Sequence, residues 1–358
     1  MALLREDLDG LGVLLSDAAA WLSHRAGVNI LPTVVEKDFW VTETLRLLSI
    51  PQRFDAPSDD AYPVTVRAVF KGGTSLSKAF GIIERFSEDI DVFLAVDPVC
   101  GSQPTSRRNC REPPPFHLGA GRVDAIMKAT AARVALQLDV PHEPYGASRR
   151  GTKRAYALLY PEAVDRATYA AGGLKEGVRL ELVRMGTPTP NAAHTLTSML
   201  ADYVAAEGLV PLSEFEELAP FTMDVLAPER TLVDKLCILH DVASRTLTGE
   251  SSRLAGQARH YYDVHQLLNT PAVIQSLEAA TDLVATYAAA AEQDSIAVRR
   301  PGTARPAAGF ASSPAFCDES LLRSARTEYQ REMSRLRMGD YPSLDEVVAS
   351  VQGAAHLL

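Results

Sequence analysis

The apolar positions of the first fifty residues repeat at helical spacing. Residues 3–24 and 34–48 both carry apolar side chains three and four positions apart, which predicts two helices. Thr33 followed by Glu36 has the spacing of a capping box and predicts the start of the second helix. We therefore expect residues 1–50 to form a pair of N-terminal helices.

The pattern then changes to alternation. Within residues 61–70, Val64, Val66 and Ala68 alternate with polar or charged side chains, as in a half-buried strand. This strand runs directly into the sequence KGGTS at 71–75, and residues 76–83 return to a helical pattern. Residues 90–96 predict a second strand.

Further elements follow in the same way. A proline-rich stretch at 97–120 predicts a long loop. Strands are predicted at 155–160, 178–185 and 221–226, and helices at 123–138, 192–207, 228–247, 257–268, 272–291 and 320–337, with a flexible linker at 298–314. This order predicts an α+β fold, with a mixed sheet and flanking helices at 51–226, an insertion at about 97–154, and a helical region at 227–358.

Composition excludes several classes of protein. Side chains are 46% hydrophobic and 23% charged, so the chain is able to bury a large core and is not disordered as a whole. The four cysteines form no CxxC pair, which argues against a zinc ribbon or a disulfide scaffold and favours a reducing cytoplasm. The first residues are acidic where a signal peptide needs basic ones, and the apolar runs are shorter than the roughly 20 residues that span a bilayer. We expect a cytoplasmic protein without membrane segments.

Charge is unevenly distributed. The net charge of -9 argues against nonspecific coating of nucleic acid. Residues 101–160 nevertheless hold ten basic and four acidic side chains, an excess of six that is able to bind phosphate. A solvated surface explains any one of these cations equally well. The basic residues are Arg107, Arg108, Arg111, Arg122, Lys128, Arg133, Arg149, Arg150, Lys153 and Arg154.

The most informative chemistry lies in residues 70–94, FKGGTSLSKAFGIIERFSEDIDVFL. Gly72 and Gly73 let a backbone approach a phosphate closely, and the amides of the helix that follows favour an anion. Ser75 adds a hydroxyl donor. The predicted nucleotide-binding residues here are Lys71, Gly72, Gly73, Thr74 and Ser75.

Two carboxylates follow on the second predicted strand. Residues two apart on a strand lie on the same face, roughly 6.6 to 6.8 Å apart, so Asp89 and Asp91 are expected to project together while Ile90 faces the core. Either feature alone is weak evidence, because glycine pairs and Asp-x-Asp sequences are common. Together they predict a site that holds a nucleoside triphosphate and its magnesium ions.

This segment resembles the AbiEii/AbiGii-type nucleotidyltransferase toxins, a branch of the polymerase-beta-like nucleotidyltransferase superfamily that includes the MenT toxins. Residues 36–40 (EKDFW) are similar to the N-terminal motif of the family, 228–236 to its lysine motif, and 259–264 (RHYYDV) to its closing aspartate motif. The four motifs occur in the family's order between about residue 30 and about residue 270. The proline-rich insertion and the tail after residue 292 match no family motif, and Arg259 and His260 stand where many relatives carry a lysine.

The resemblance implies a polymerase-beta-like core and the toxin of a toxin–antitoxin or phage-defence system. It implies transfer of a nucleoside monophosphate from a triphosphate to the 3′ end of tRNA, with two Mg²⁺ ions, and this modification blocks translation. A winged-helix antitoxin encoded next to the gene is the implied partner. Two alternatives stay open: transfer to a small molecule or a protein hydroxyl, and an inactive binding protein on the same scaffold.

The resemblance also assigns residues. It implies Asp89 and Asp91 as metal ligands and catalytic residues. Glu181, on the polar face of an alternating strand, is the candidate third ligand, and the alternative is a surface acid paired with Arg179.

Lys235 and Asp263 complete the implied catalytic set. Lys235 lies beside an apolar helical stripe, from whose edge it would reach the triphosphate. Asp263 has apolar neighbours, so its carboxylate needs a partner such as Lys235 or a bound substrate. A buried structural ion pair is the competing interpretation.

Overall fold

The computed structural model describes residues 3–55, 63–85, 87, 89–98, 120–147, 153–165, 175–184, 188–249, 254–297, 305–336 and 339–358. Internal contacts divide the chain into two compact units. The first contains Met1–Arg25, Asn29–Thr74 and Glu88–Val225, and the second contains Ala26–Val28, Ser75–Ser87 and Leu226–Leu358. No helix among the described residues is long and apolar enough to span a membrane.

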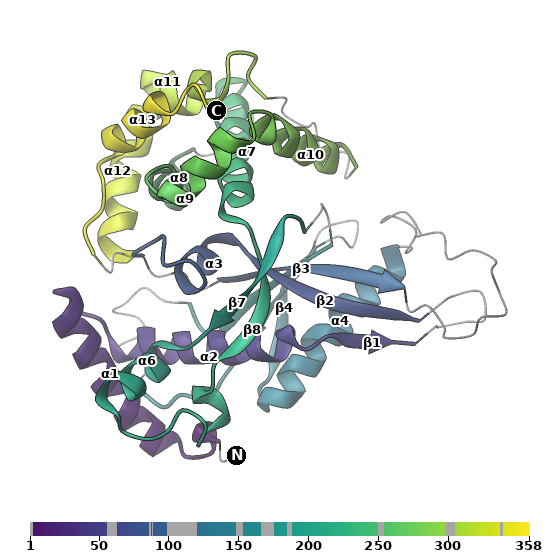
Figure 1. Ribbon diagram of the computed structural model, residues 1–358, viewed down its shortest axis with the longest axis vertical. Helices are drawn as coiled ribbons and strands as arrows, with labels where there is room; N and C mark the ends of the chain where they lie inside the picture. Colours follow the sequence, from purple (N-terminus) through teal and green to yellow (C-terminus); the bar gives the residue numbers. More distant parts are fainter. Residues whose placement is uncertain are drawn as a thin grey trace. The chain divides into compact units, whose positions relative to one another are not determined.

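A mixed sheet forms the centre of the first unit (Figure 1). The described residues give eight strands, in the order β4-β5-β6-β3-β2-β8-β7, with β1 paired to β2. β2 runs antiparallel to β3, whereas β3 and β6 are parallel. The predicted α+β class with a mixed sheet is therefore confirmed. The strands are β1 (Gln52–Phe54), β2 (Val64–Lys71), β3 (Asp89–Pro98), β4 (His142–Ala147), β5 (Lys153–Leu158), β6 (Val178–Val183), β7 (Asn191–Leu196) and β8 (Phe221–Leu226).

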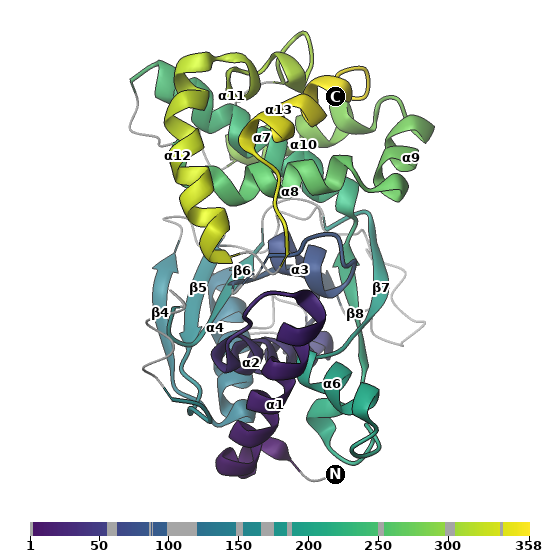
Figure 2. The same ribbon diagram turned by 90° about the vertical axis from the view of Figure 1, so that its left-hand side faces the viewer.

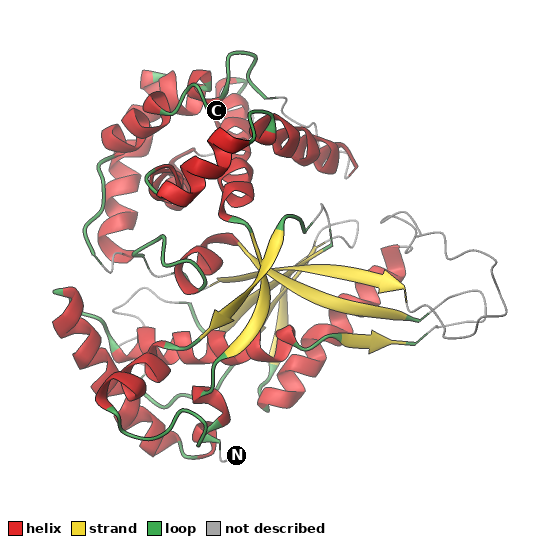
Figure 3. Cartoon of the chain, in the orientation of Figure 1, coloured by secondary structure: helices red, strands yellow, loops and turns green. Residues whose placement is uncertain are grey.

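Helices pack against this sheet (Figure 3). α2 contacts β2 and β6, and α4 contacts β5. Trp40 of α2 is buried and stacks on Tyr160, with ring centroids 5.2 Å apart, as expected for a core residue. The helices of this unit are η1 (Leu4–Glu6), α1 (Leu8–Ala26), α2 (Pro32–Ser49), α4 (Ala120–Leu138), α6 (Met199–Glu207) and η2 (Glu216–Leu218), while α3 (Gly72–Lys78) begins here and ends in the second unit.

Three consecutive charged residues of α2 are buried. Glu36, Lys37 and Asp38 expose at most 5% of their surface, so each needs a polar partner inside the fold. Each side chain binds backbone from a different segment. The partners are Ala163 N for Glu36 at 2.5 Å, the Lys175 carbonyl for Lys37, and Met199 N for Asp38 at 2.7 Å. The EKDFW motif thus attaches three segments of the first unit to α2.

The predicted capping box is wrong. α2 begins at Pro32, its N-cap is Leu31, and no side chain caps it. Proline is favoured in the first helical turn because its missing N–H needs no partner there. Thr33 therefore lies inside the helix, and Glu36 binds Ala163 instead of the helix start.

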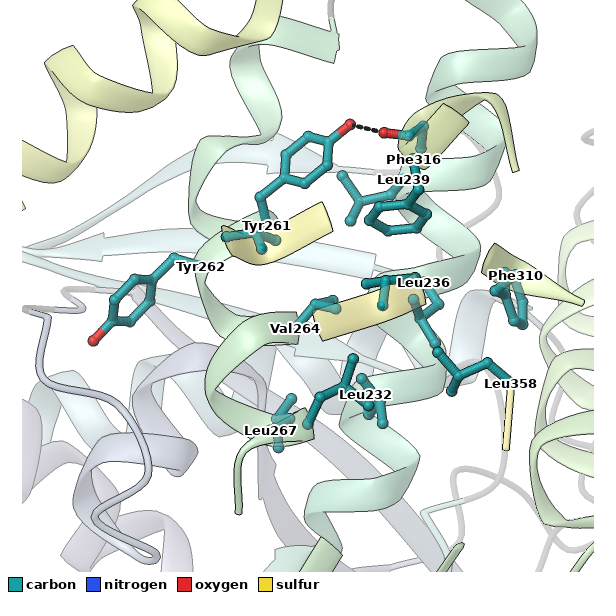
Figure 4. Close-up of a cluster of buried hydrophobic side chains, with 14 of the residues drawn as sticks. Leu232, Leu236, Leu239, Tyr261, Tyr262, Val264, Leu267, Phe310, Phe316 and Leu358 are labelled. Carbon is teal, nitrogen blue, oxygen red and sulfur yellow. Dashed lines mark hydrogen bonds between the residues drawn. The ribbon is translucent and has the colours of Figure 1, made fainter. Parts of the chain in front are cut away.

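The second unit is helical (Figure 2). α8 packs against both α7 and α13 around a large apolar core. Within it Tyr261 packs edge-on against Phe316, and its hydroxyl donates to the Ala315 carbonyl at 2.7 Å (Figure 4). The helices are α7 (Pro228–Leu247), η3 (Leu254–Gln257), α8 (Ala258–Leu268), α9 (Pro271–Ala279), α10 (Leu283–Ala297), η4 (Phe310–Ser312), α11 (Pro314–Cys317), α12 (Glu319–Leu336) and α13 (Leu344–Gly353).

Several predicted boundaries need correction. The helix predicted at 192–207 is strand β7 followed by α6, because the Ser198 hydroxyl accepts from Ala201 N and starts the helix there. The helix predicted at 272–291 is divided into α9 and α10. The helix after the glycine pair begins at Gly72 and ends at Lys78, rather than occupying 76–83.

Two other expectations concern loops. The linker predicted at 298–314 is wrong for its described part, since Phe310 is 1% exposed and packs in the helical core. Residues 298–304 and most of the predicted 97–120 loop lie outside the described residues. β4 was not predicted, because all six of its residues are exposed and give no alternating pattern.

Candidate active site

Strand β3 places two aspartates on one face. Ile90, Val92 and Leu94 expose at most 1% of their surface, so they form the core face of the strand. Asp89 and Asp91 lie on the opposite face, as the alternation predicts. The two carboxylates therefore share one surface of the sheet.

The strand register adds charged neighbours on both sides. Lys71 of β2 and Glu181 of β6 are both directly opposite Asp91. Arg179 of β6 is opposite Asp89. Because directly paired residues point to the same face, these five side chains occupy one polar patch, which we call the carboxylate face.

Gly72 is required next to this face. Its φ of 81° is in the left-handed region that favours glycine. A Cβ on Gly72 would collide with the Asp91 carboxylate and lie 3.1 Å from its Cβ. The absence of a side chain at Gly72 therefore leaves space for Asp91, the candidate metal ligand. It would also let a phosphate approach the backbone, as the sequence predicts.

The hydroxyls after the glycine pair are not on the surface. Thr74 and Ser75 expose 2% and 0% of their surface. Thr74 Oγ1 donates to the Asp89 carbonyl at 2.5 Å, which fixes the start of β3 against α3. Of the predicted nucleotide-binding residues, Lys71 and Gly72 lie beside the Asp91 side chain, whereas the Thr74 and Ser75 side chains are buried.

Burial and neighbouring charged groups shift the pKa values of Asp91 and Glu181. Burial raises the pKa of Asp91 to about 6; the Lys71 charge opposes this, and the Glu181 charge adds to it. Burial also disfavours ionised Glu181, but hydrogen bonds from Lys153 and Asp91 outweigh it and lower the pKa of Glu181. The same set of neighbours therefore shifts the pKa values of the two acids in opposite directions, Asp91 upward and Glu181 downward.

Lysines neutralise the carboxylate face. Lys153 Nζ pairs with Glu181, and Lys175 Nζ lies 3.7 Å from Asp89 Oδ2. Glu181 is thus ion-paired, but with Lys153 rather than with Arg179. Arg154 pairs with Asp124. Arg107, Arg108, Arg111, Arg149 and Arg150 lie outside the described residues.

The carboxylate face offers oxygen ligands of the kind that bind a divalent cation. Among the described residues no three Asp, Glu, His or Cys side chains form a complete metal-binding group. Mg²⁺ usually takes only one or two carboxylates, with waters and phosphate oxygens as its other ligands. Asp91 and Glu181 are adjacent, and the Asp89 charge acts on Asp91. Their oxygens therefore match this type of site.

A second charged cluster lies inside the helical unit. Asp263 of α8 is fully buried and binds Lys235 of α7, with Oδ2 and Nζ 2.6 Å apart. Arg85 makes two parallel bonds to the same carboxylate, Nε to Oδ1 at 2.8 Å and Nη2 to Oδ2 at 2.7 Å. The expected partnership of Lys235 with Asp263 is confirmed. Arg85, four residues before Asp89, was not among the predicted residues.

His260 completes this cluster. Its Nδ1 lies 3.4 Å from Lys235 Nζ. Burial, together with the Lys235 charge, lowers the pKa of His260 to about 3, so the ring is neutral and accepts a hydrogen bond from the ammonium. Arg85 and Lys235 hold the pKa of Asp263 well below its usual range against the effect of burial. Two cations and one carboxylate leave the cluster with one net positive charge.

Arg259 has a separate partner. It is the other residue that stands where relatives carry a lysine, and its Nε lies 2.9 Å from Glu332 Oε1 of α12. Its charge is therefore balanced locally. The charge of Glu332 also acts on Arg85, so this acid of α12 lies near both arginines.

Comparison with known proteins identifies the family. The family model for the nucleotidyl transferase AbiEii toxin of type IV toxin–antitoxin systems matches residues 60–350. A solved structure of MenT4, a nucleotidyltransferase toxin from Mycobacterium tuberculosis H37Rv, is similar at 20% identity and a TM-score of 0.38, covering 89% of this chain and 99% of that one. The search of curated proteins gave no match. The family match spans both units, and so the chain belongs to the AbiEii family and is a nucleotidyltransferase toxin of a type IV toxin–antitoxin system.

Proposed function

We propose that this toxin transfers a nucleoside monophosphate to the 3′ end of tRNA in the cytoplasm. The acceptor hydroxyl forms a bond to the α-phosphorus, and the bond to the leaving pyrophosphate breaks. Modification of the 3′ end prevents aminoacylation and stops translation. A winged-helix antitoxin encoded by the neighbouring gene would counteract the enzyme.

The observation that carries this proposal is the carboxylate face. Asp89, Asp91 and Glu181 lie on adjacent strands β3 and β6, beside Lys71 and Gly72. Their oxygens would hold Mg²⁺, which supplies electrostatic stabilisation of the transferring phosphoryl group. Lys71 and the backbone at Gly72 and Gly73 are assigned to the triphosphate.

The Arg85–Lys235–Asp263 cluster supports binding of an anion. We assign Lys235 to neutralisation of phosphate charge and Asp263 to holding Lys235 in place. Arg85 shares the carboxylate and is fixed by two hydrogen bonds, so it is a positioning residue for the same cluster. An ordered cation stabilises developing negative charge more effectively than a mobile one.

The deciding experiment incubates the protein with total RNA and each labelled nucleoside triphosphate in turn. We expect label in a tRNA-sized band with Mg²⁺ and none after addition of EDTA, because the carboxylate face needs the cation to bind the triphosphate. Label on protein, or on small molecules only, would support the alternative acceptors. Absence of transfer to any acceptor, with the triphosphate still bound, would indicate an inactive binding protein.

Basic residues between β4 and β5 are expected to bind RNA. Lys153 and Arg154 have carboxylate partners, so removing them would also disturb Glu181 and Asp124. We therefore expect Arg149→Ala with Arg150→Ala to raise the KM for tRNA and flatten its salt dependence, while leaving the KM for triphosphate unchanged. The measurement is initial rate against tRNA concentration at several salt concentrations.

A matched variant on α12 provides the control. Arg323→Ala with Arg335→Ala removes two arginines that are exposed on α12. If this control loses tRNA affinity and the 149/150 variant does not, the acceptor is held by α12, which also contains Arg326 and Arg331. Arg337 follows α12 in the sequence and lies outside the described residues. Arg326 and Arg331 already pair with acidic neighbours, which makes this outcome the less expected one.

A further inference from the structure

An aromatic side chain at the edge of the sheet lies beside the carboxylate face. Tyr145 is in β4, and the register between β4 and β5 shifts between Pro144 and Gly146. Such a bulge leaves one residue without a direct partner and turns its side chain away from the regular direction. In this strand the residue so placed is Tyr145.

The turned side chain reaches β6. Tyr145 Oη donates to Glu181 Oε1 at 3.3 Å. The guanidinium carbon of Arg179 lies 4.5 Å from the centre of the tyrosine ring, a cation–π distance. Burial and the Glu181 charge raise the pKa of Tyr145, so the phenol stays protonated and remains a donor.

Tyr145 is nevertheless open to solvent, with 40% of its surface exposed. Proteins bind single-stranded nucleic acid by stacking its bases on aromatic side chains, with cation–π contributions from arginine. We infer that Tyr145 and Arg179 form a stacking platform for the terminal base of the nucleic acid acceptor. This inference rests on the proposed function and names the residue that binds the end of the acceptor.

The strand order favours the acceptor over the triphosphate. Lys71 and Gly72 are at the end of β2, the acids are on β3 and β6, and Tyr145 is two strands beyond β6. In phosphoryl transfer the attacking and leaving oxygens lie roughly in line on opposite sides of phosphorus. With the leaving pyrophosphate at the β2 side, the acceptor comes from the side of β4 and β5.

A lysine on that side agrees with this direction. Lys153 on β5 has 44% of its side chain exposed. A strand of RNA that ends on Tyr145 would therefore pass a partly exposed lysine that can approach a phosphate.

The test compares Tyr145→Ala, Tyr145→Phe and wild type on two acceptors: tRNA, and the same tRNA with a 3′-terminal nucleotide that lacks its base. We expect Tyr145→Ala to raise the KM for intact tRNA about tenfold, with the KM for triphosphate unchanged. Tyr145→Phe keeps the ring and should resemble wild type. For the wild-type protein, the KM for the abasic tRNA should exceed the KM for intact tRNA by about the same factor. For Tyr145→Ala, removal of the base should raise the KM no further, because the stacking contact is already absent.

His142→Ala, at an exposed position of the same strand, is the matched control and should behave as wild type. Four results overturn the inference. Equal defects in the Phe and Ala variants would assign Tyr145 to positioning Glu181 through its hydroxyl, and a raised KM for triphosphate would assign it to the donor nucleotide. An unchanged Tyr145→Ala enzyme would exclude stacking. If the wild-type protein labels no RNA, the proposed RNA acceptor is wrong and the stacking inference falls with it. The other three results overturn the stacking inference alone.

Discussion

Asp89→Asn and Asp91→Asn are each expected to lower the rate of nucleotide transfer by roughly a hundredfold or more. Each substitution removes the charge of a proposed metal ligand but keeps nearly the same side-chain volume. Asp91 also occupies the space that Gly72 leaves open, so a side chain of the same size should preserve the packing there. The measurement is the initial rate of label transfer at saturating triphosphate, over a range of Mg²⁺ concentrations.

Asp97→Asn is the matched control for these two variants. Asp97 lies on the same strand and pairs with Arg67, and both side chains are about half exposed. Loss of an exposed ion pair costs little stability, so this variant should keep full activity. If the Asp89 and Asp91 variants have normal melting temperatures and keep most of their activity, these residues are not metal ligands.

Hydrophobic patterning was sufficient for the elements that carry the candidate site. β8 and α7 begin and end at the predicted residues, and the strand predicted at 90–96 is β3, which begins one residue earlier at Asp89. The reason is physical: these segments bury one regular face, so the period of their apolar residues reveals the structure. Periodicity alone assigns no chemistry to these residues. The roles that the family motifs suggest for them stay predictions.

The sequence was less informative where local hydrogen bonds or strand exposure decide the structure. Ser198 ends the β7 region and starts α6, although the apolar pattern runs on without interruption. β4 is exposed on both faces, so Tyr145 carried no signal before the register was known. Pairings between distant residues, such as Arg85 with Asp263, depend on the tertiary fold and had no local pattern to reveal them.

Asp263→Ala is expected to destabilise the protein by about 3–5 kcal/mol, because it leaves two buried cations without their carboxylate. Arg85 and Lys235 have only 4% and 5% of their side chains exposed, so water cannot replace the lost partner fully. Since the neighbouring cations lower the pKa of Asp263, its carboxylate is ionised throughout the neutral range. The destabilisation, measured by urea unfolding, should therefore be the same at pH 6 and pH 8.

Lys235→Met separates the chemistry of this cluster from its stability. Asp263 keeps both hydrogen bonds from Arg85, so we expect a smaller loss of about 1–2 kcal/mol. If Lys235 neutralises triphosphate charge, transfer should still fall by roughly a hundredfold or more in a folded protein. Arg245→Met, on the same helix and paired with Asp241 at the surface, should change neither property. Normal kinetics for Lys235→Met would show that the Lys235–Asp263 ion pair serves only to hold α7 against α8. Lys235 would then have no role in neutralising the charge of the triphosphate.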